Sequence, residues 1–337
     1  MRRTILAAWL AALGAWAWAC GLETGPDAPP RTNGCEPGVD CNPTDGGGVG
    51  VDGGGPGDDG GGGVDPLAGT TRMATLVHGG LGFTEGPVWI NGHLLFSDTN
   101  ANVIDRLLDD GGVSTFRNNS GGANGNAVDS AGNLVTCEGG NHRVTSTAGG
   151  TMGGAVASIA DTFNAKQFNS PNDVIARADG NIYFTDPNYS GNPDIQDAEA
   201  VYRIPPGGGG AQRLAFTFMK PNGISLSPDG NTLYVCDNGA GQMFAAPLAG
   251  DGTLAATFTE IFKAPGCDGM AVDDDGNLYV ADIGGVDVFR KSGKGIGSIT
   301  LPQQPSNCTF GGADRKTLFI TARTGLYSIV LGVPGLP

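Results

Sequence analysis

The stretch Asp268-Gly-Met-Ala-Val-Asp-Asp-Asp-Gly-Asn-Leu-Tyr-Val-Ala-Asp282 consists of two short apolar runs separated by Asp-Gly-Asn. An Asp-Gly turn between two such runs is a strong signal for a β-hairpin. The stretch therefore predicts a hairpin that begins and ends on an acidic residue.

Five further stretches follow the same pattern. They are Glu85–Asp98, Asn124–Glu138, Asn172–Asp186, Asn222–Asp237 and Asn307–Ala322. The last residues of the six units are spaced roughly 40 to 51 residues apart, and no long stretch has helical periodicity. Hairpins that repeat with this period predict an all-β fold, a six-bladed β-propeller. We expect residues 325–331 and 74–78 to share the closing blade, which removes an open sheet edge.

The N-terminal residues predict export. Residues 1–19 read as a signal peptide, with Arg2 and Arg3, an apolar run and Ala17-Trp18-Ala19 before the cleavage point. Cys20 follows at once, so the site also reads as a lipobox with Cys20 as the lipidated residue. Two localisations stay open, an outer-membrane lipoprotein and a free secreted or periplasmic protein.

Residues 20–67 predict a flexible linker rich in Gly and Asp, because almost no large apolar residues occur there. A calcium-binding β-roll is disfavoured, since no nine-residue period is kept. Cys35 and Cys41 are candidates for a local disulfide. The propeller is expected over residues 68–337.

The 337 residues include 60 glycines and carry a formal net charge of −15. An acidic body argues against nucleic acid and anionic membrane surfaces as partners. We expect membrane contact only through a lipid anchor at Cys20, a small-molecule substrate as the partner, and a monomer.

Aligning the six units places one polar residue at the head of each. These residues are Glu85, Asn124, Asn172, Asn222, Asp268 and Asn307. Inner strands of a propeller lie side by side around a channel, so the six positions are expected to form one ring. Converging carboxylate and amide oxygens suit Ca²⁺, whereas Zn²⁺ and Cu²⁺ prefer His or Cys. The alternative is that these residues only cap strand starts; their repetition in six units favours a metal.

Several motifs resemble the regucalcin/gluconolactonase family across residues 75–331. They are Thr84-Glu-Gly-Pro-Val-Trp89, Phe168-Asn-Ser-Pro-Asn-Asp-Val174, Tyr183-Phe-Thr-Asp-Pro-Asn-Tyr189, Pro221-Asn-Gly223, Cys267-Asp-Gly-Met270 and Ser306-Asn-Cys-Thr-Phe-Gly-Gly312. The resemblance implies a six-bladed propeller with one catalytic divalent cation, usually Ca²⁺, and lactone hydrolysis. Mg²⁺, Mn²⁺ and Zn²⁺ are alternative ions. The family's metal ligands match Glu85, Asn172, Asn222 and Asp268 here.

The resemblance also makes Asp268 the candidate base, which would take a proton from the attacking water. Asn124, Asp186 and His142 are predicted to orient water or contact the substrate, and Asn307 to complete the ring structurally. By contrast, Asp98, Asp237 and Asp282 end strands and are expected to bind backbone amides.

The sequence gives less support to other catalytic mechanisms. The sequence has no Gly-x-Ser-x-Gly elbow, His-Glu-x-x-His motif or Walker loop. Cys137, Cys236, Cys267 and Cys308 are expected to be buried thiols, with a disulfide among them left open. Two functions remain: a calcium-dependent lactone hydrolase, which we favour, and a non-catalytic binding propeller with a structural Ca²⁺ ion. A strictosidine-synthase-like role fits the acid-containing ring less well.

Overall fold

The computed structural model describes residues 64–336. The predicted signal peptide over residues 1–19, the lipidation at Cys20, the pairing of Cys35 with Cys41 and nearly all of the predicted linker lie outside the described residues. In the part that is described, no helix is long and apolar enough to cross a membrane.

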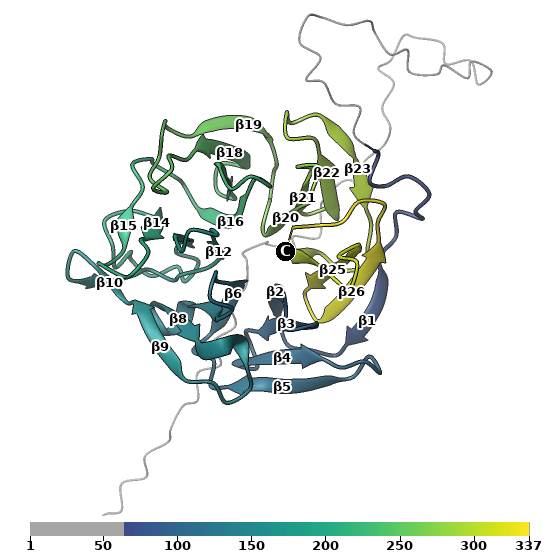
Figure 1. Ribbon diagram of the computed structural model, residues 1–337, viewed down its shortest axis with the longest axis horizontal. Coiled ribbons are helices and arrows are strands. Elements are labelled where there is room, and N and C mark those ends of the chain that lie inside the picture. The colour runs from purple at the N-terminus through teal and green to yellow at the C-terminus, as the bar shows by residue number, and fades with distance from the viewer. Residues whose placement is uncertain (1–63, 337) are drawn as a thin grey trace, which may run out of the picture. The chain divides into compact units, whose positions relative to one another are not determined.

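Six four-stranded antiparallel sheets surround a central channel, which confirms the predicted six-bladed β-propeller (Figure 1). Blade 1 contains β2 (Thr84–Ile90), β3 (His93–Asp98), β4 (Val103–Leu107) and β5 (Val113–Asn118). Blade 2 contains β6 (Ala123–Val128), β7 (Leu134–Glu138), β8 (Arg143–Thr147) and β9 (Val156–Ala160). Blade 3 contains β12 (Val174–Ala176), β13 (Ile182–Asp186), β14 (Ala200–Ile204) and β15 (Gln212–Arg213).

Blade 4 contains β16 (Pro221–Leu226), β17 (Thr232–Asp237), β18 (Gln242–Pro247) and β19 (Thr259–Lys263). Blade 5 contains β20 (Met270–Val272), β21 (Leu278–Ala281), β22 (Val286–Phe289) and β23 (Gly295–Ile299). The β10–β11 hairpin (Thr162–Phe163 and Lys166–Gln167), which the repeats did not predict, lies between blades 2 and 3 in the sequence. Two 3₁₀ turns, Gly139–Asn141 and Ala148–Gly150, are the helical elements of the described residues.

Blade 6 joins the two ends of the propeller. Its inner strands β24 (Pro305–Gly311), β25 (Thr317–Ala322) and β26 (Gly325–Val330) come from the end of the chain, and its outer strand β1 (Thr75–Gly79) comes from the start. Strand β1 pairs antiparallel with β26, with Thr75 opposite Ser328 and Gly79 opposite Gly325. This arrangement confirms the predicted closing blade.

The hydrophobic core lies largely between neighbouring blades. One cluster combines Val135 and Val144 of blade 2 with Phe184 and Tyr202 of blade 3, and all four side chains are completely buried. The innermost strands β2, β6, β12, β16, β20 and β24 contact one another in a closed circle. Packing between blades therefore fixes the spacing of the inner strands, and with it the positions of residues at their heads.

The folded body begins slightly earlier than predicted. Leu67, assigned to the linker, is 1% exposed and packs into a core cluster of blades 5 and 6. The backbone of Pro66 accepts a hydrogen bond from the amide of Gly332. Leu67, at the end of a polar and glycine-rich segment, is thus part of the propeller.

We predict that Leu67→Ala lowers the free energy of unfolding by about 2–5 kcal/mol, because it leaves a cavity in this core. Urea denaturation of the purified protein would measure the change. The matched control is Leu76→Ala on β1, where Leu76 is 54% exposed and the expected change is within about 0.5 kcal/mol. Equal effects of the two substitutions would contradict the assignment of Leu67 to the core.

Candidate functional site

The predicted ring residues lie where the inner strands are irregular. In β2, β6, β16 and β24 the pairing with the second strand shifts register at residues 85–88, 123–126, 221–224 and 305–307. Strands β12 and β20 begin two residues after Asn172 and Asp268. Bulges next to a site redirect side chains and end regular pairing. The register shifts in four blades, and the late start of the inner strand in the other two, leave the six head residues outside regular sheet pairing.

Glycine allows the six heads to approach one another closely. A Cβ atom on Gly86, Gly125, Gly223 or Gly269 would lie only 2.0 to 2.3 Å from an atom of the next inner strand. The amide of Gly125 donates to the carbonyl of Asn172 at 2.7 Å, and that of Gly223 donates to the carbonyl of Asp268 at 3.0 Å. Each glycine follows a ring residue, so the ring is held together by backbone contacts between blades.

Buried carboxylates gather at this ring. Glu85 is 4% exposed, and burial, followed by repulsion from Asp268 and Asp173, raises its pKa well above the usual value. Burial and repulsion from Asp173 raise the pKa of Asp268 to about 7, against a hydrogen bond from Asn222 that lowers it. Burial therefore disfavours the charged form of both carboxyl groups, and the neighbouring side chains do not fully compensate for it.

The sequence analysis missed Asp173. Burial raises the pKa of its carboxyl group to about 7, although the group accepts hydrogen bonds from the amides of Val174 and Ile224 at 3.0 and 3.2 Å. Ile224 belongs to the next blade, so Asp173 joins blades 3 and 4 beside the ring. Its signal in the sequence is that Asn172 is followed by Asp, where most other ring residues are followed by Gly.

The amide residues of the ring have different surroundings. The Asn222 side chain donates to the Tyr189 hydroxyl at 2.8 Å, and the Lys220 ammonium lies 4.9 Å from the centre of the Tyr189 ring. Asn307 is 6% exposed and accepts a hydrogen bond from the amide of Cys308, which agrees with a structural role. Asn124 and Asn172 are half-buried at their strand heads. Tyr189 and Lys220 were not predicted, because loops have no repeat to align.

Asp186 does not lie in the ring. It is fully buried and accepts hydrogen bonds from the amides of Asn169 and Ser170 at 2.9 and 2.7 Å. Asp98 and Asp237 do the same in their blades, with the amides of Gly82 and Phe83 and of Met219 and Lys220. Asp186 therefore anchors the segment that enters its own blade, and this placement replaces the expected contact with substrate. The predicted amide binding by Asp98 and Asp237 is confirmed, and Asp282 also accepts from amides, those of Gly284 and Gly285.

His142 lies in the turn after β7, at the ring end of blade 2. Its Nδ1 atom is 2.7 Å from the carbonyl oxygen of Asn169. A carbonyl only accepts, so Nδ1 carries a proton and donates it to Asn169. The neighbouring Glu138 is fully engaged by Arg117, Arg143 and Thr145. His142 is thus oriented by a backbone group and keeps one ring nitrogen for another partner.

A cavity of about 540 Å³ runs along the inner strands, with Asn126, Asp173 and Asn307 among its lining residues. In blades 1 to 5 its lining starts one or two residues after the ring position. The ring therefore closes one end of this channel cavity. On the other side of the ring are the loops that end the second strands, including those with His142 and Tyr189.

The residues of the ring fit a hard divalent cation. Within residues 64–336, no group of three or more His, Cys, Asp and Glu side chains is arranged to hold a metal. A cation would therefore need the amide oxygens of Asn172 and Asn222 together with the carboxylates of Glu85 and Asp268. Such an all-oxygen set suits Ca²⁺. The raised pKa values of the buried carboxylates show that a positive charge would be favourable there.

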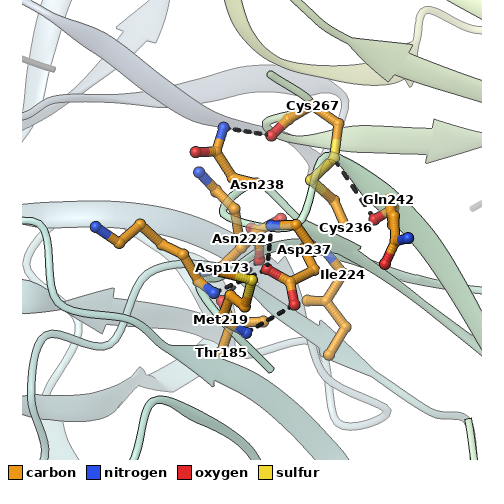
Figure 2. Close-up of a disulfide and its surroundings, with 12 residues drawn as sticks. Asp173, Thr185, Met219, Asn222, Ile224, Cys236, Asp237, Asn238, Gln242 and Cys267 are labelled. Carbon is orange, nitrogen blue, oxygen red and sulfur yellow. Dashed lines mark hydrogen bonds between the residues drawn. A yellow bond between two sulfur atoms is a disulfide. The ribbon is translucent and has the colours of Figure 1, made fainter. Parts of the chain in front are cut away.

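The cysteines differ in part from the expectation of buried thiols. Cys137 and Cys308 are buried thiols, whereas Cys236 and Cys267 form a disulfide with an S–S distance of 2.05 Å. This disulfide joins β17 to the residue that precedes Asp268 (Figure 2). The sequence left this pairing open, because four buried cysteines on similar strands allow several partners.

Comparison with known proteins identifies the family. The model of the SMP-30/Gluconolactonase/LRE-like region matches residues 83–324, which is more than half of the chain. The chain belongs to this family. The match starts just before Glu85 and ends after Ala322, so it contains all six ring positions.

Individual relatives agree with this assignment. The chain is 34% identical to a gluconolactonase of Zymomonas mobilis over 274 residues, which is 71% of this chain and 76% of that protein. The solved structure of a gluconolactonase from Xanthomonas campestris superimposes with a TM-score of 0.71 at 32% identity and covers 77% of this chain and 89% of its own. A calcium-binding regucalcin from Agrobacterium tumefaciens, with a TM-score of 0.66, 18% identity and coverage of 78% and 95%, shares the fold.

We predict that Gly223→Ala lowers the melting temperature, because the new Cβ atom would lie 2.2 Å from the carbonyl oxygen of Asp268. Thermal unfolding would measure this effect. The control is Gly250→Ala, since no atom lies within 4 Å of a Cβ there. A Gly223 variant indistinguishable from the Gly250 variant would contradict the close approach of the inner strands.

We predict that, in a chelator, Asp268→Asn stabilises the protein increasingly as pH rises. The pKa of Asp268 is about 7 in the folded protein and lower in the unfolded chain. The folded protein therefore holds more protons, and its free energy of unfolding falls as pH rises from about 4 to about 7. Asn removes this contribution. The difference in melting temperature between variant and parent should be small at the low end of this window and largest above it. A constant difference would contradict the prediction.

Proposed function

We propose that the protein hydrolyses sugar lactones with the help of Ca²⁺ bound at the ring. The observation that supports it most is that Asp268 of blade 5 lies close to Glu85 of blade 1 and interacts with the side chain of Asn222 of blade 4 at one end of the channel. The family and the gluconolactonase relatives support the substrate class. Mg²⁺, Mn²⁺ and Zn²⁺ are alternative ions for the same oxygen ligands.

In this proposal the cation supplies Lewis-acid polarisation of the lactone carbonyl and favours the negative charge that develops on its oxygen. The residues of the chain do the rest. Asp268 takes the proton of the water that attacks the carbonyl carbon. Glu85, Asn172 and Asn222 would hold the cation through their side-chain oxygens.

Substrate contacts are assigned to the loops on the ring side. Asn124 is itself one of the ring residues, and it is half-buried. The Nε2 atom of His142 is available for a hydrogen bond with substrate. The Tyr189 hydroxyl accepts a hydrogen bond from the side chain of Asn222. Polar groups of these kinds can hold the hydroxyl groups of a sugar lactone.

We also propose that the protein acts outside the cytoplasm, as a lipoprotein or a free secreted protein. The predicted signal in residues 1–19 supports this, and so does the Cys236–Cys267 disulfide, because disulfides persist in oxidising compartments.

The test is hydrolysis of D-glucono-δ-lactone by the purified protein, followed as acid release. We expect EDTA to abolish turnover and added Ca²⁺ to restore it. Asp268→Asn keeps a ligand oxygen but no base, so turnover should fall by about 100-fold or more while Ca²⁺ still binds. Asp268→Ala should lose both.

The control is Asp229→Asn, the same change on an exposed hairpin at the opposite end of blade 4, which should leave turnover unchanged. If Ca²⁺ binds at the ring but no compound in a panel of lactones is hydrolysed, the protein is a binding propeller with a structural ion. Equal turnover by Asp268→Asn and the parent would remove Asp268 as the base.

A further inference from the structure

Four ring residues, Asn124, Asn172, Asn222 and Asp268, accept a hydrogen bond on their backbone carbonyl from the blade before them. The penultimate residue of the repeat's second strand does this in two blades through a hydroxyl group. Ser97 donates to the carbonyl oxygen of Asn124 at 2.7 Å, and Thr185 donates to the carbonyl oxygen of Asn222 at 2.7 Å. These hydrogen bonds fix the backbone of a ring residue to the preceding blade.

In blade 4 the same position is Cys236, and the contact is covalent. Cys236 is bonded to Cys267, which directly precedes the ring residue Asp268. Both cysteines are completely buried. The disulfide thus stands where blades 1 and 3 use a hydroxyl group, and it reaches the segment that carries the ring carboxylate Asp268.

Further contacts hold the same segment to blade 4. The Asn238 side chain donates to the carbonyl oxygen of Cys267 at 2.8 Å, as Figure 2 shows. The amide of Ala264 donates to the carbonyl oxygen of Gly241 at 2.9 Å. On the far side of the disulfide, the amide of Gly223 donates to the carbonyl oxygen of Asp268. Blade 4 therefore holds the backbone around Asp268 through the disulfide, the Asn238 side chain and the amide of Gly223.

These contacts with blade 4 matter for the position of Asp268. Asp268 lies next to the buried residues Glu85 and Asp173, and binding of a cation there would require its side chain to keep this place. Within blade 5 the amide of Asp268 donates to the carbonyl oxygen of Ala281, while the regular strand β20 begins only at Met270.

We propose that the Cys236–Cys267 disulfide is a positioning device that keeps Asp268 at the ring ready for the cation. The proposal rests on the proposed function for the role of the cation. It predicts that loss of the disulfide weakens cation binding through the placement of Asp268. A disulfide also stabilises a protein by restricting the unfolded chain, so the test must separate placement from stability.

Three full-length variants make this separation. Cys236→Ala with Cys267→Ala removes the disulfide. Cys236→Thr with Cys267→Ala provides a hydroxyl where Thr185 has one in blade 3. Phe258→Leu, in the core of blade 4 against Phe216 and Phe218, lowers stability without contacting the Asp268 segment. Far-ultraviolet circular dichroism and thermal unfolding confirm the fold and give the loss of melting temperature of each variant.

Two readouts are taken well below the melting temperatures. The first is the Kd of Ca²⁺ by calorimetry. The second is hydrogen exchange of the Asp268 amide, which donates to the carbonyl oxygen of Ala281 at 2.8 Å and is protected in the folded protein. The second readout needs no bound metal.

We expect the double-alanine variant to raise the Kd of Ca²⁺ by about 10-fold or more, which is the usual cost of losing a group that orients a metal ligand. Its Asp268 amide should exchange faster. The threonine variant should regain part of both losses, and Phe258→Leu should change neither. If the double-alanine variant and Phe258→Leu give the same Kd and exchange rate, the disulfide acts through stability alone and the proposal is overturned.

The proposed function can fail separately. Absence of Ca²⁺ binding by the parent protein would remove the cation from the ring. Hydrogen exchange would then still decide whether the disulfide places Asp268, because selective loss of protection in the double-alanine variant supports the positioning and its absence overturns it.

Discussion

The close approach of six inner strands at one end of the channel is the constraint on which the site depends. It requires glycine after ring residues, because a Cβ atom on Gly86, Gly125, Gly223 or Gly269 would overlap the next strand. The same glycines donate or allow backbone hydrogen bonds between blades. Backbone contacts between blades therefore define the six ring positions, whereas the side chains at these positions differ from blade to blade.

The close approach of the inner strands brings several carboxyl groups together in buried surroundings. Glu85, Asp173 and Asp268 all have raised pKa values, and burial is the largest cause for each. Folding alone gains nothing from such a cluster. Its repulsion is offset by packing between blades, by inter-blade hydrogen bonds and by the disulfide next to Asp268. A cation would convert the same unfavourable charges into ligands, which links the stability of the channel to its chemistry.

The fold and most of the ring were predictable because both are repeated. Six Asp-Gly or related turns with one period define the blades, and alignment of the units brings Glu85 and Asp268 to equivalent places. Features that occur once had no such support. Asp186 shares the acid at the strand end with Asp98, yet only the structure shows that its oxygens accept backbone amides. The pairing of Cys236 with Cys267 depends on the distance between two blades, which no spacing in the sequence contains.

The closing blade has a consequence for how the chain reaches this state. Strand β1 at residues 75–79 finds its partner β26 only at residues 325–330. The propeller cannot close before residues 325–330 have been made. Until then β1 has no partner strand, and contacts so distant in sequence form slowly.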